Sequence, residues 1–292
     1  MTAPSPKLLL VGGNGMLAQK IAALAKADYA ITAVDLPEFD LTDREQVLSL
    51  VTELKPEVVI NCAAYTNVDG CESEAALAER VNGTAVGYLA EAAKQVDATL
   101  AHISTDYVFD GAKETPYSEE DAPNPQSAYG RSKLLGEQAL MASGIEKFFI
   151  LRTSWLYGPG GNNFVETIAR LAKERAELRI VADQVGSPTY TGDLAQAVLN
   201  LLALKDAAYG LYHFSNQGQC SWCEFAVAIV EQLKKAGETL AVEKITPIAT
   251  HEYPLPAPRP AFSLMSKQKY VAATGAKPPQ WQESLRQYFS ER

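Results

Sequence analysis

Residues 7–18 read KLLLVGGNGMLA, and this stretch decides the fold. A short apolar run ends at Gly12, and the pattern Gly12-x-x-Gly15-x-x-Ala18 leads into a helical stretch that extends to about Lys26. A strand, a glycine turn and a helix in this order bring backbone N–H groups and a helix N-terminus to a pyrophosphate. Gly12 allows the tight turn, Gly15 lets the phosphates approach, and Ala18 suits close packing of the helix on the strand. The stretch predicts a dinucleotide site, although a tight turn without a ligand has the same pattern.

An acidic residue strengthens this interpretation. The next predicted strand, 30–34, ends at Asp35, about 20 residues beyond the turn, as the dinucleotide fingerprint requires. A carboxylate there accepts a hydrogen bond from a ribose 2′-hydroxyl and repels a 2′-phosphate. Asp35 therefore favours NADH over NADPH on electrostatic grounds.

Helices and strands then alternate as far as about Trp155. Helices are expected at 43–54, 73–95 and 126–142, and strands at 58–64, 99–105 and 148–153. Such alternation is typical of βαβ units and of a parallel sheet with both faces covered. The predicted fold class is α/β, a Rossmann-like doubly wound parallel sheet.

Beyond Trp155 the sequence changes character. Loops are expected at 157–164, 183–189 and 254–260, the last too proline-rich for a helix or a central strand. Helices are expected between them at 164–175, 191–204 and 222–233. We expect a dinucleotide-binding domain in residues 1–155, to which later segments return, and mainly a smaller substrate-binding lobe in residues 156–292.

Composition narrows the class of protein. With 292 residues, 47% of them hydrophobic, the chain can bury the core of one large domain or of one and a half. No apolar run approaches the roughly 18 to 20 residues that span a bilayer, and the N-terminal residues lack the layout of a signal peptide. A net charge of -9 argues against general affinity for nucleic acid or for an anionic membrane. These features predict a soluble, cytoplasmic protein, with room for local basic pockets that bind a phosphorylated small molecule.

The cysteines do not indicate a further site. Four cysteines in a chain of this length do not make a disulfide framework. Cys220 and Cys223 have the C-x-x-C spacing of redox or metal sites, but Ser221 and Glu224 between and beside them form a capping box that opens a helix. No second pair of cysteines or histidines completes a metal set, so no metal ligands are predicted.

Tyr129 and Lys133 are the candidate catalytic pair. Their spacing places them on one face of the predicted helix 126–142. The ammonium there can lower the pKa of the phenol from about 10, which makes the phenol a usable proton donor or acceptor. The strand before this helix ends in hydroxyl residues, which can hydrogen-bond the oxygen of a substrate held against the tyrosine. A surface helix with no catalytic role has the same spacing.

Several motifs occur in an order that resembles dTDP-4-dehydrorhamnose reductases, a family of extended short-chain dehydrogenases/reductases. The resemblance covers essentially the whole chain. The motifs are the glycine turn, NCAAYTNVD at 61–69, STDYVFDG at 104–111, Tyr129-x-x-x-Lys133, RTSWLYG at 152–158, GNNF at 161–164, DQxGxPT at 183–189 and Arg259-Pro260.

The resemblance implies that hydride passes from NADH or NADPH to the C4 ketone of dTDP-4-dehydro-L-rhamnose, a nucleotide sugar. It assigns Tyr129 as the general acid, Thr105 as a hydrogen-bond donor to the reacting oxygen, and Lys133 as the residue that holds the nicotinamide ribose and lowers the tyrosine pKa. It places Asp106 and Trp155 on the sugar nucleotide and the Arg259 loop at its diphosphate. The cofactor positions, besides Tyr129 and Lys133, are Gly12, Asn14, Gly15, Met16 and Leu17 at the phosphates, Asp35 at the ribose, Asp40 and Leu41 at the adenine, and Ala63, Ala64, Tyr65 and Thr66 on the far side.

Some features of the family stay open. The family commonly has glycine at the position of Ala18, a change that the fingerprint tolerates, and it often accepts both nicotinamides. Some members form a homodimer with a divalent metal, such as Mg²⁺, at the interface. The sequence itself specifies neither the dimer nor the metal.

Three other functions share these motifs. A sugar-nucleotide dehydratase or epimerase has the same fold, but dehydratases typically carry Asp-Glu after the threonine, where this chain has Asp106-Tyr107. A non-catalytic subunit resembling the regulatory subunit of methionine adenosyltransferase would show an eroded catalytic set, which this chain retains. A reductase of another nucleotide-linked 4-keto sugar remains open, because a few loop contacts separate hexoses.

Overall fold

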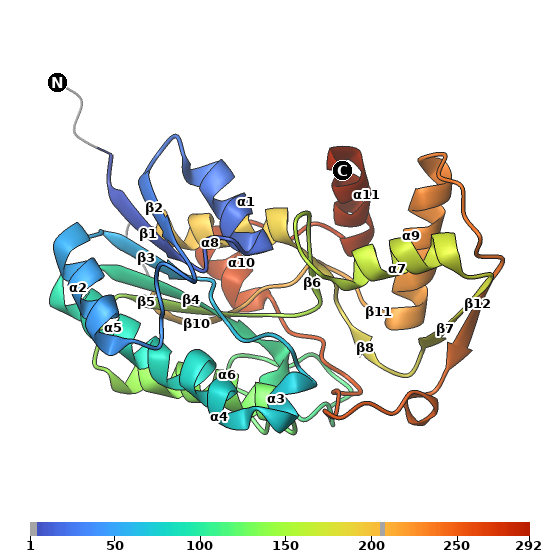
Figure 1. Cartoon of the computed structure of the whole chain (residues 1–292), viewed down its shortest axis with the longest axis horizontal. Helices are drawn as coiled ribbons and strands as arrows, with labels where there is room; N and C mark the ends of the chain where they lie inside the picture. Colours follow the sequence, from blue (N-terminus) through green and yellow to red (C-terminus); the bar gives the residue numbers. More distant parts are fainter. Residues whose placement is uncertain (1–4, 205–207) are drawn as a thin grey trace.

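A six-stranded parallel sheet forms the larger part of the computed structural model, which describes residues 5–204 and 208–292 (Figure 1). Residues 1–4, part of the N-terminal segment that lacks the layout of a signal peptide, lie outside the described residues. The strands are β1 (Lys7–Val11), β2 (Ala30–Val34), β3 (Val58–Asn61), β4 (Thr99–Thr105), β5 (Phe148–Thr153) and β10 (Gly210–His213). Their order is β10-β5-β4-β3-β1-β2, and every neighbouring pair is parallel. The predicted Rossmann-like fold class is confirmed.

Helices cover both faces of the sheet, as the apolar run of β1 requires. Leu8 and Leu10 belong to the core beneath α1 (Met16–Ala25) and α8 (Thr191–Leu202), whereas Leu9 and Val11 belong to the opposite core beneath α2 (Arg44–Leu54) and α5 (Ala85–Gln95). Successive side chains of a strand point to opposite faces, so a strand covered on both sides is apolar throughout. The helix α6 (Ala128–Ala142), which carries Tyr129 and Lys133, lies on the same side as α5 (Figure 1).

The single long helix expected at 73–95 is wrong. The chain instead forms α3 (Gly70–Ser73), α4 (Ala75–Glu79), a π-helical turn at Arg80–Thr84 and then α5. The buried Asn82 lies in the π turn, where its amide bonds the Tyr65 backbone and the Ser132 hydroxyl. A widened turn of this kind is common at functional sites, and here it turns a polar side chain away from the helical ladder toward the loop after β3.

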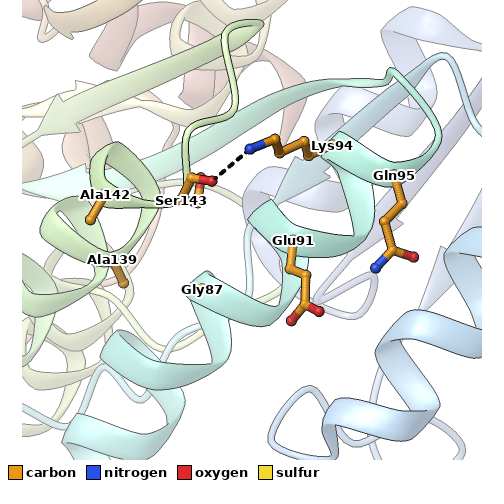
Figure 2. A pocket seen from close by; sticks show the side chains of 7 residues that line it. All are labelled: Gly87, Glu91, Lys94, Gln95, Ala139, Ala142 and Ser143. Carbon is orange, nitrogen blue, oxygen red and sulfur yellow. Dashed lines mark hydrogen bonds between the residues drawn. The ribbon is translucent and has the colours of Figure 1, made fainter.

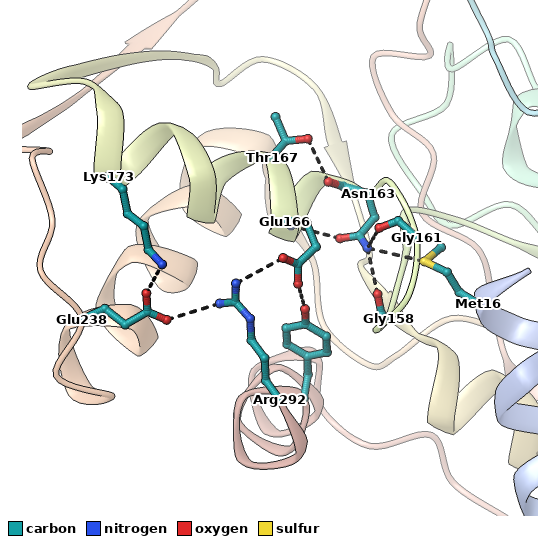
Figure 3. A network of polar contacts seen from close by, with 10 residues as sticks. Met16, Gly158, Gly161, Asn163, Glu166, Thr167, Lys173, Glu238 and Arg292 are labelled. Atoms are coloured by element: carbon teal, nitrogen blue, oxygen red, sulfur yellow. Dashed lines mark hydrogen bonds and ion pairs between the residues drawn. The ribbon is translucent and has the colours of Figure 1, made fainter.

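A smaller lobe packs around its own core. Its helices are α7 (Phe164–Glu174), α9 (Trp222–Lys235) and α11 (Trp281–Glu291), and β7 (Glu177–Val181) pairs in parallel with β12 (Lys244–Ile248). The predicted capping box of Ser221 and Glu224 opens α9. The C-terminus closes the lobe, where Arg292 bonds Glu166 at 3.2 Å and lies 3.6 Å from Glu238 (Figure 3). The sequence had not indicated β7, β12 or α11.

Two ladders of two-residue strands and two short 3-10 turns also occur in the described residues. β6 (Leu156–Tyr157) pairs with β9 (Thr189–Tyr190), and β8 (Val185–Gly186) pairs with β11 (Cys220–Ser221). The 3-10 turns are Asp106–Val108 and Thr250–Glu252. No helix within residues 5–204 and 208–292 has the length and apolar character needed to cross a membrane.

Three segments beyond residue 155 return to the sheet. The strand β10 extends it next to β5, and α8 and α10 (Gln268–Thr274) pack over the face that α1 covers. The helix expected at 191–204 is one of these returning segments, because Leu194, Val198 and Leu201 of α8 share the core of α1. The division at residue 155 itself stays a prediction.

Candidate active site

The glycine turn is built for a close backbone approach. Gly12 has φ +80, and a Cβ there would lie 2.6 Å from the backbone N of Ala63, so only glycine fits between the two loops. The N–H groups of Gly12 and Gly13 donate to the Val34 carbonyl. The helix α1 begins at Met16 with no side chain capping its first turn. Its first backbone N–H groups are therefore suited to bind an anionic group such as a pyrophosphate.

Asp35 is tied directly to this turn. Its carboxylate accepts hydrogen bonds from the backbone N–H of Asn14 at 2.9 Å and of Leu36 at 2.8 Å. Further along, Asp40 accepts from both the N–H and the hydroxyl of Thr42, while the Leu41 side chain is buried in the core. Leu41, predicted beside the adenine, thus has only its backbone left for such a contact.

Two buried asparagines hold the loop after β3. Asn61 Oδ1 accepts from the Ala63 N–H at 3.1 Å, and Asn82 bonds both the N–H of Tyr65 (2.7 Å) and its carbonyl (3.0 Å). In the segment 63–66, predicted on the far side of the cofactor, the backbone is therefore held at Ala63 and at Tyr65. Sequence reasoning missed Asn82, whose only signal was a polar residue inside an apolar helical pattern.

Tyr129 and Thr105 lie together at the end of β4. Burial raises the pKa of the Tyr129 phenol above its usual value, and a hydrogen bond with the Thr105 hydroxyl offsets part of that rise. The Tyr107 ring contacts the Tyr129 ring edge to face, with centroids 5.4 Å apart. The Thr105 hydroxyl therefore lies near enough to Tyr129 to influence its pKa, and a joint action of the two on a substrate oxygen stays a prediction.

Lys133 is buried behind them and does not lower the tyrosine pKa. Its Nζ donates to the Ile103 carbonyl at 2.7 Å and lies 3.4 Å from His102 Nε2. Burial lowers the pKa of Lys133 to about 8, against the opposing influence of Glu137 and Cys62. The expectation that Lys133 depresses the phenol pKa is wrong for this structure, because the cost of burying a phenolate exceeds the effect of any neighbouring charge.

A buried ion pair supports this arrangement from below. Glu137, one turn beyond Lys133 on α6, accepts two hydrogen bonds from the Arg152 guanidinium at 2.9 and 2.6 Å and one from the Ser104 hydroxyl at 2.5 Å. These contacts join β4, β5 and α6 in one network. Removing one partner of such a buried pair strongly destabilises the fold, because the other charge is left buried without compensation.

Asp106 carries a carboxylate oxygen without a partner. The residue is 2% exposed, and its Oδ1 bonds the Thr105 hydroxyl at 3.1 Å. Within the described part of the chain its Oδ2 is buried and unbonded. Burial raises the pKa of Asp106 to about 6, although hydrogen bonds from Ser263 and Thr105 oppose the shift. Such an oxygen suits a ligand hydroxyl, as the prediction of a sugar contact requires.

Arg259 reaches the site but is already paired. Its guanidinium forms a two-point contact with Asp69, at 2.6 and 2.7 Å, and bonds the Ala257 carbonyl. Hydrogen bonding to Arg259 lowers the pKa of Asp69. The proline-rich loop is thus fastened to the loop after β3, and a diphosphate would meet an arginine whose charge is partly neutralised.

The lobe also touches the glycine turn. The loop before α7 places Asn163 against α1, where its Nδ2 lies 3.4 Å from Met16 Sδ and donates to the carbonyls of Gly158 and Gly161 (Figure 3). Lys20 of α1 forms an ion pair with Glu291 of α11 at 2.6 Å. Met16, predicted at the phosphates, therefore also contacts the lobe.

Two surface pockets lie away from these residues. One, of about 650 Å³, is bounded by α5 and α6, where Lys94 Nζ donates to the Ser143 carbonyl (Figure 2). The other, of about 840 Å³, is lined by Met265, Lys267 and Gln217 among others. No predicted catalytic residue lines either pocket.

The cysteines of the C-x-x-C pair are not joined in a disulfide. Cys220 and Cys223 are free, and burial raises the pKa of both thiols. Among residues 5–204 and 208–292, no three His, Cys, Asp or Glu side chains group as metal ligands. No chemical step is assigned to Mg²⁺.

The parallel sheet, the uncapped helix at a glycine turn and a Tyr-x-x-x-Lys helix beside a strand-end threonine define a Rossmann-like protein of the short-chain dehydrogenase/reductase type. The family described as the RmlD substrate binding domain matches residues 6–292. The chain belongs to the dTDP-4-dehydrorhamnose reductase family, whose members are oxidoreductases.

Individual relatives agree over nearly their full length. The spore coat polysaccharide biosynthesis protein SpsK of Bacillus subtilis is 42% identical, with 98% of each chain covered. The dTDP-4-dehydrorhamnose reductase of Aggregatibacter actinomycetemcomitans is 41% identical, over 96% of this chain and 97% of that protein. The solved structure of the Bacillus anthracis reductase in complex with NADP is 40% identical, covers 99% and 100% of the two chains, and superimposes with a TM-score of 0.92. A UDP-glucose 4-epimerase at 19% identity shares the fold only.

Proposed function

We propose that the chain reduces the C4 ketone of dTDP-4-dehydro-L-rhamnose to give dTDP-L-rhamnose. The observation that carries the proposal is the place of Thr105 at the carboxyl end of β4, close enough to the partly buried Tyr129 of α6 to influence the pKa of its phenol. Ligands of an open parallel sheet bind at that edge. Family membership supplies the substrate class.

Burial prepares Tyr129 to give a proton rather than to take one. Because its pKa is raised, the phenol keeps its proton at neutral pH. As hydride reaches C4, negative charge develops on the ketone oxygen, and Tyr129 donates its proton to that oxygen. The Thr105 hydroxyl donates a hydrogen bond to the same oxygen, and Asp106 Oδ2 accepts one from a sugar hydroxyl.

A nicotinamide dinucleotide fits the remaining surfaces and supplies the hydride when bound. The uncapped first turn of α1 and the turn at Gly12 would hold its phosphates, Asp35 the adenosine ribose, and the Lys133 ammonium the nicotinamide ribose. The NADP complex of the Bacillus anthracis relative supports NADPH, and the carboxylate of Asp35 supports NADH. We therefore propose that both are used.

The test is a turnover assay with purified protein, both nicotinamides and a panel of nucleotide-linked 4-keto sugars. The expected result is fastest turnover of the dTDP-4-dehydro-L-rhamnose substrate. Faster turnover of another sugar of the panel would instead identify a related reductase. No turnover with any sugar, together with intact nicotinamide binding, would favour the non-catalytic subunit.

The cellular setting is part of the proposal. A protein that uses soluble nicotinamides and nucleotide sugars is expected in the cytoplasm. The family resemblance also implies a homodimer, which light scattering of the purified chain with and without Mg²⁺ would test.

A further inference from the structure

Trp155 and Trp222 form a stacked pair where the sheet domain meets the lobe. Trp155 follows β5, and Trp222 is the first residue of α9. The two ring systems lie 3.5 Å apart at an angle of 8°. Trp222 is fixed in turn by its Nε1–H, which donates to Gln184 Oε1 at 3.1 Å, and by contact with the Phe164 ring.

Gly186 bounds the same indole from another side. A Cβ on Gly186 would lie 2.6 Å from Trp155 Cε2 and 2.8 Å from its Nε1, so a larger residue would displace the ring. Gly186 pairs with Cys220 in the ladder of β8 and β11, two residues before Trp222. The contacts that hold Trp155 therefore share one short piece of sheet.

That piece of sheet is connected to the catalytic end of β4. Val185 donates to the Ala261 carbonyl and accepts from the Ser263 N–H, both at 2.8 Å. The Ser263 side chain lies close enough to Asp106, the residue that follows Thr105, to oppose the rise in the pKa of that carboxyl. The position of the indole is thus set relative to the proposed sugar contacts.

Trp155 needs such support because its backbone is unfavourable. Its φ is +49, in the left-handed region that bulky residues rarely adopt. A conformation of that kind persists only where the surroundings enforce it, and it is common at ligand sites. Among the described residues no acceptor bonds the Trp155 Nε1–H, and the side chain is partly exposed.

We propose that Trp222 is a positioning residue for the nucleotide sugar: it holds the Trp155 indole so that the Nε1–H can donate to an oxygen of that substrate. The inference rests on the proposed function, in which Trp155 contacts the sugar nucleotide. The competing role for Trp222 is packing alone, because it also borders the lobe core.

The test compares Trp222→Leu with Trp222→Phe, using Trp281→Phe as the matched control. Trp281 is buried in the same lobe but contacts Phe225 rather than Trp155. Stacked aromatic pairs contribute about 0.5–1.5 kcal/mol, so Trp222→Leu should raise KM for the nucleotide sugar roughly 3- to 10-fold. The kcat and the nicotinamide Kd should stay near wild type, and Trp222→Phe should restore most of the KM.

Near-ultraviolet circular dichroism reports on the pair itself. Two stacked indoles couple, so the wild-type protein should give a paired signal that is lost in both Trp222 variants and kept in Trp281→Phe. Should Trp222→Leu lose folding, Gly186→Ala provides the second route, because the added methyl displaces the Trp155 ring and leaves the Trp222 side chain in place. Gly186→Ala should raise the same KM.

Two results would overturn the inference. One is an unchanged KM in Trp222→Leu after the coupled signal has disappeared. The other is an equal loss of nucleotide-sugar and nicotinamide binding, which indicates a general packing role. Trp155→Ala separates this inference from the proposed function: if that variant weakens nucleotide-sugar binding and Trp222→Leu does not, only the role of Trp222 fails. If Trp155→Ala changes nothing, the proposed substrate contact fails as well.

Discussion

The two sides of the site are assembled over very different distances along the chain. On the cofactor side, the hydrogen bond from the Asn14 N–H to Asp35 spans 21 residues, and one βαβ unit contains it. On the substrate side, the ion pair of Arg259 with Asp69 spans 190 residues and joins a lobe segment to the loop after β3. A local motif therefore builds the cofactor side, whereas the substrate side exists only after both parts of the molecule have folded and met. Substitutions should separate along the same line.

The largest effect is expected where the two sides meet, at Tyr129. Tyr129→Phe removes only the hydroxyl, so both binding sites should survive. A general acid contributes about 10²–10⁴-fold, and kcat should fall by that order while both binding constants change little. Single-turnover kinetics with ligand titrations measure both. Near-normal turnover in this variant would refute the proposed mechanism.

Arg259 tests the substrate side alone. Hydrogen bonds to charged groups contribute about 1.5–3 kcal/mol, so Arg259→Met should raise KM for the nucleotide sugar roughly 10- to 100-fold and leave the nicotinamide Kd unchanged. Asp69→Asn is the control, because it loosens the loop and keeps the guanidinium. If both variants raise KM equally, the arginine acts as a fastening of the loop rather than as a diphosphate ligand.

Asp35 tests the cofactor side alone. Its charge opposes a 2′-phosphate by about 1 kcal/mol or more, so Asp35→Ala should shift the ratio of kcat/KM for NADPH over NADH upward by at least about fivefold. Asp35→Asn keeps an acceptor for the Asn14 N–H and removes the charge, which separates electrostatics from the shape of the turn. An unchanged ratio in both variants would remove Asp35 from the ribose site.

The smallest effect concerns pH and belongs to Lys133. Its pKa is lowered from 10.5 to about 8, so the ammonium is lost as pH rises through 8, and nicotinamide binding should weaken there. Between pH 8 and 10.5 the unfolded chain binds more protons at this residue than the folded one, so this group makes the free energy of unfolding rise with pH. Lys133→Met should abolish both trends, as titration calorimetry and denaturant melts would show. If nicotinamide binding also stops depending on pH in Tyr129→Phe, the group that titrates near pH 8 is the tyrosine instead.

The features that the sequence could predict are those that depend on residues close together along the chain. The turn at Gly12 and the place of Asp35 beside it were predictable, because both depend on local spacing along the chain. Asn82 and Glu137 were not, because a buried polar residue gains its role from partners on distant elements. The pKa of Tyr129 was predicted in the wrong direction, since spacing reveals a nearby lysine and says nothing of how deeply the phenol is buried.

The path of the chain has a consequence for engineering. After β5 the chain enters the lobe, returns for α8 and β10, leaves again for α9 and β12, returns for α10 and ends in the lobe with α11 (Figure 1). The lobe is therefore made of three separate segments of the chain. A hybrid protein that takes its whole lobe from a relative needs all three segments replaced, each matched to the parent at its ends. A single crossover near the middle of the gene would leave each half with an incomplete core, so chimaeras are best designed as grafted loops on an intact parent.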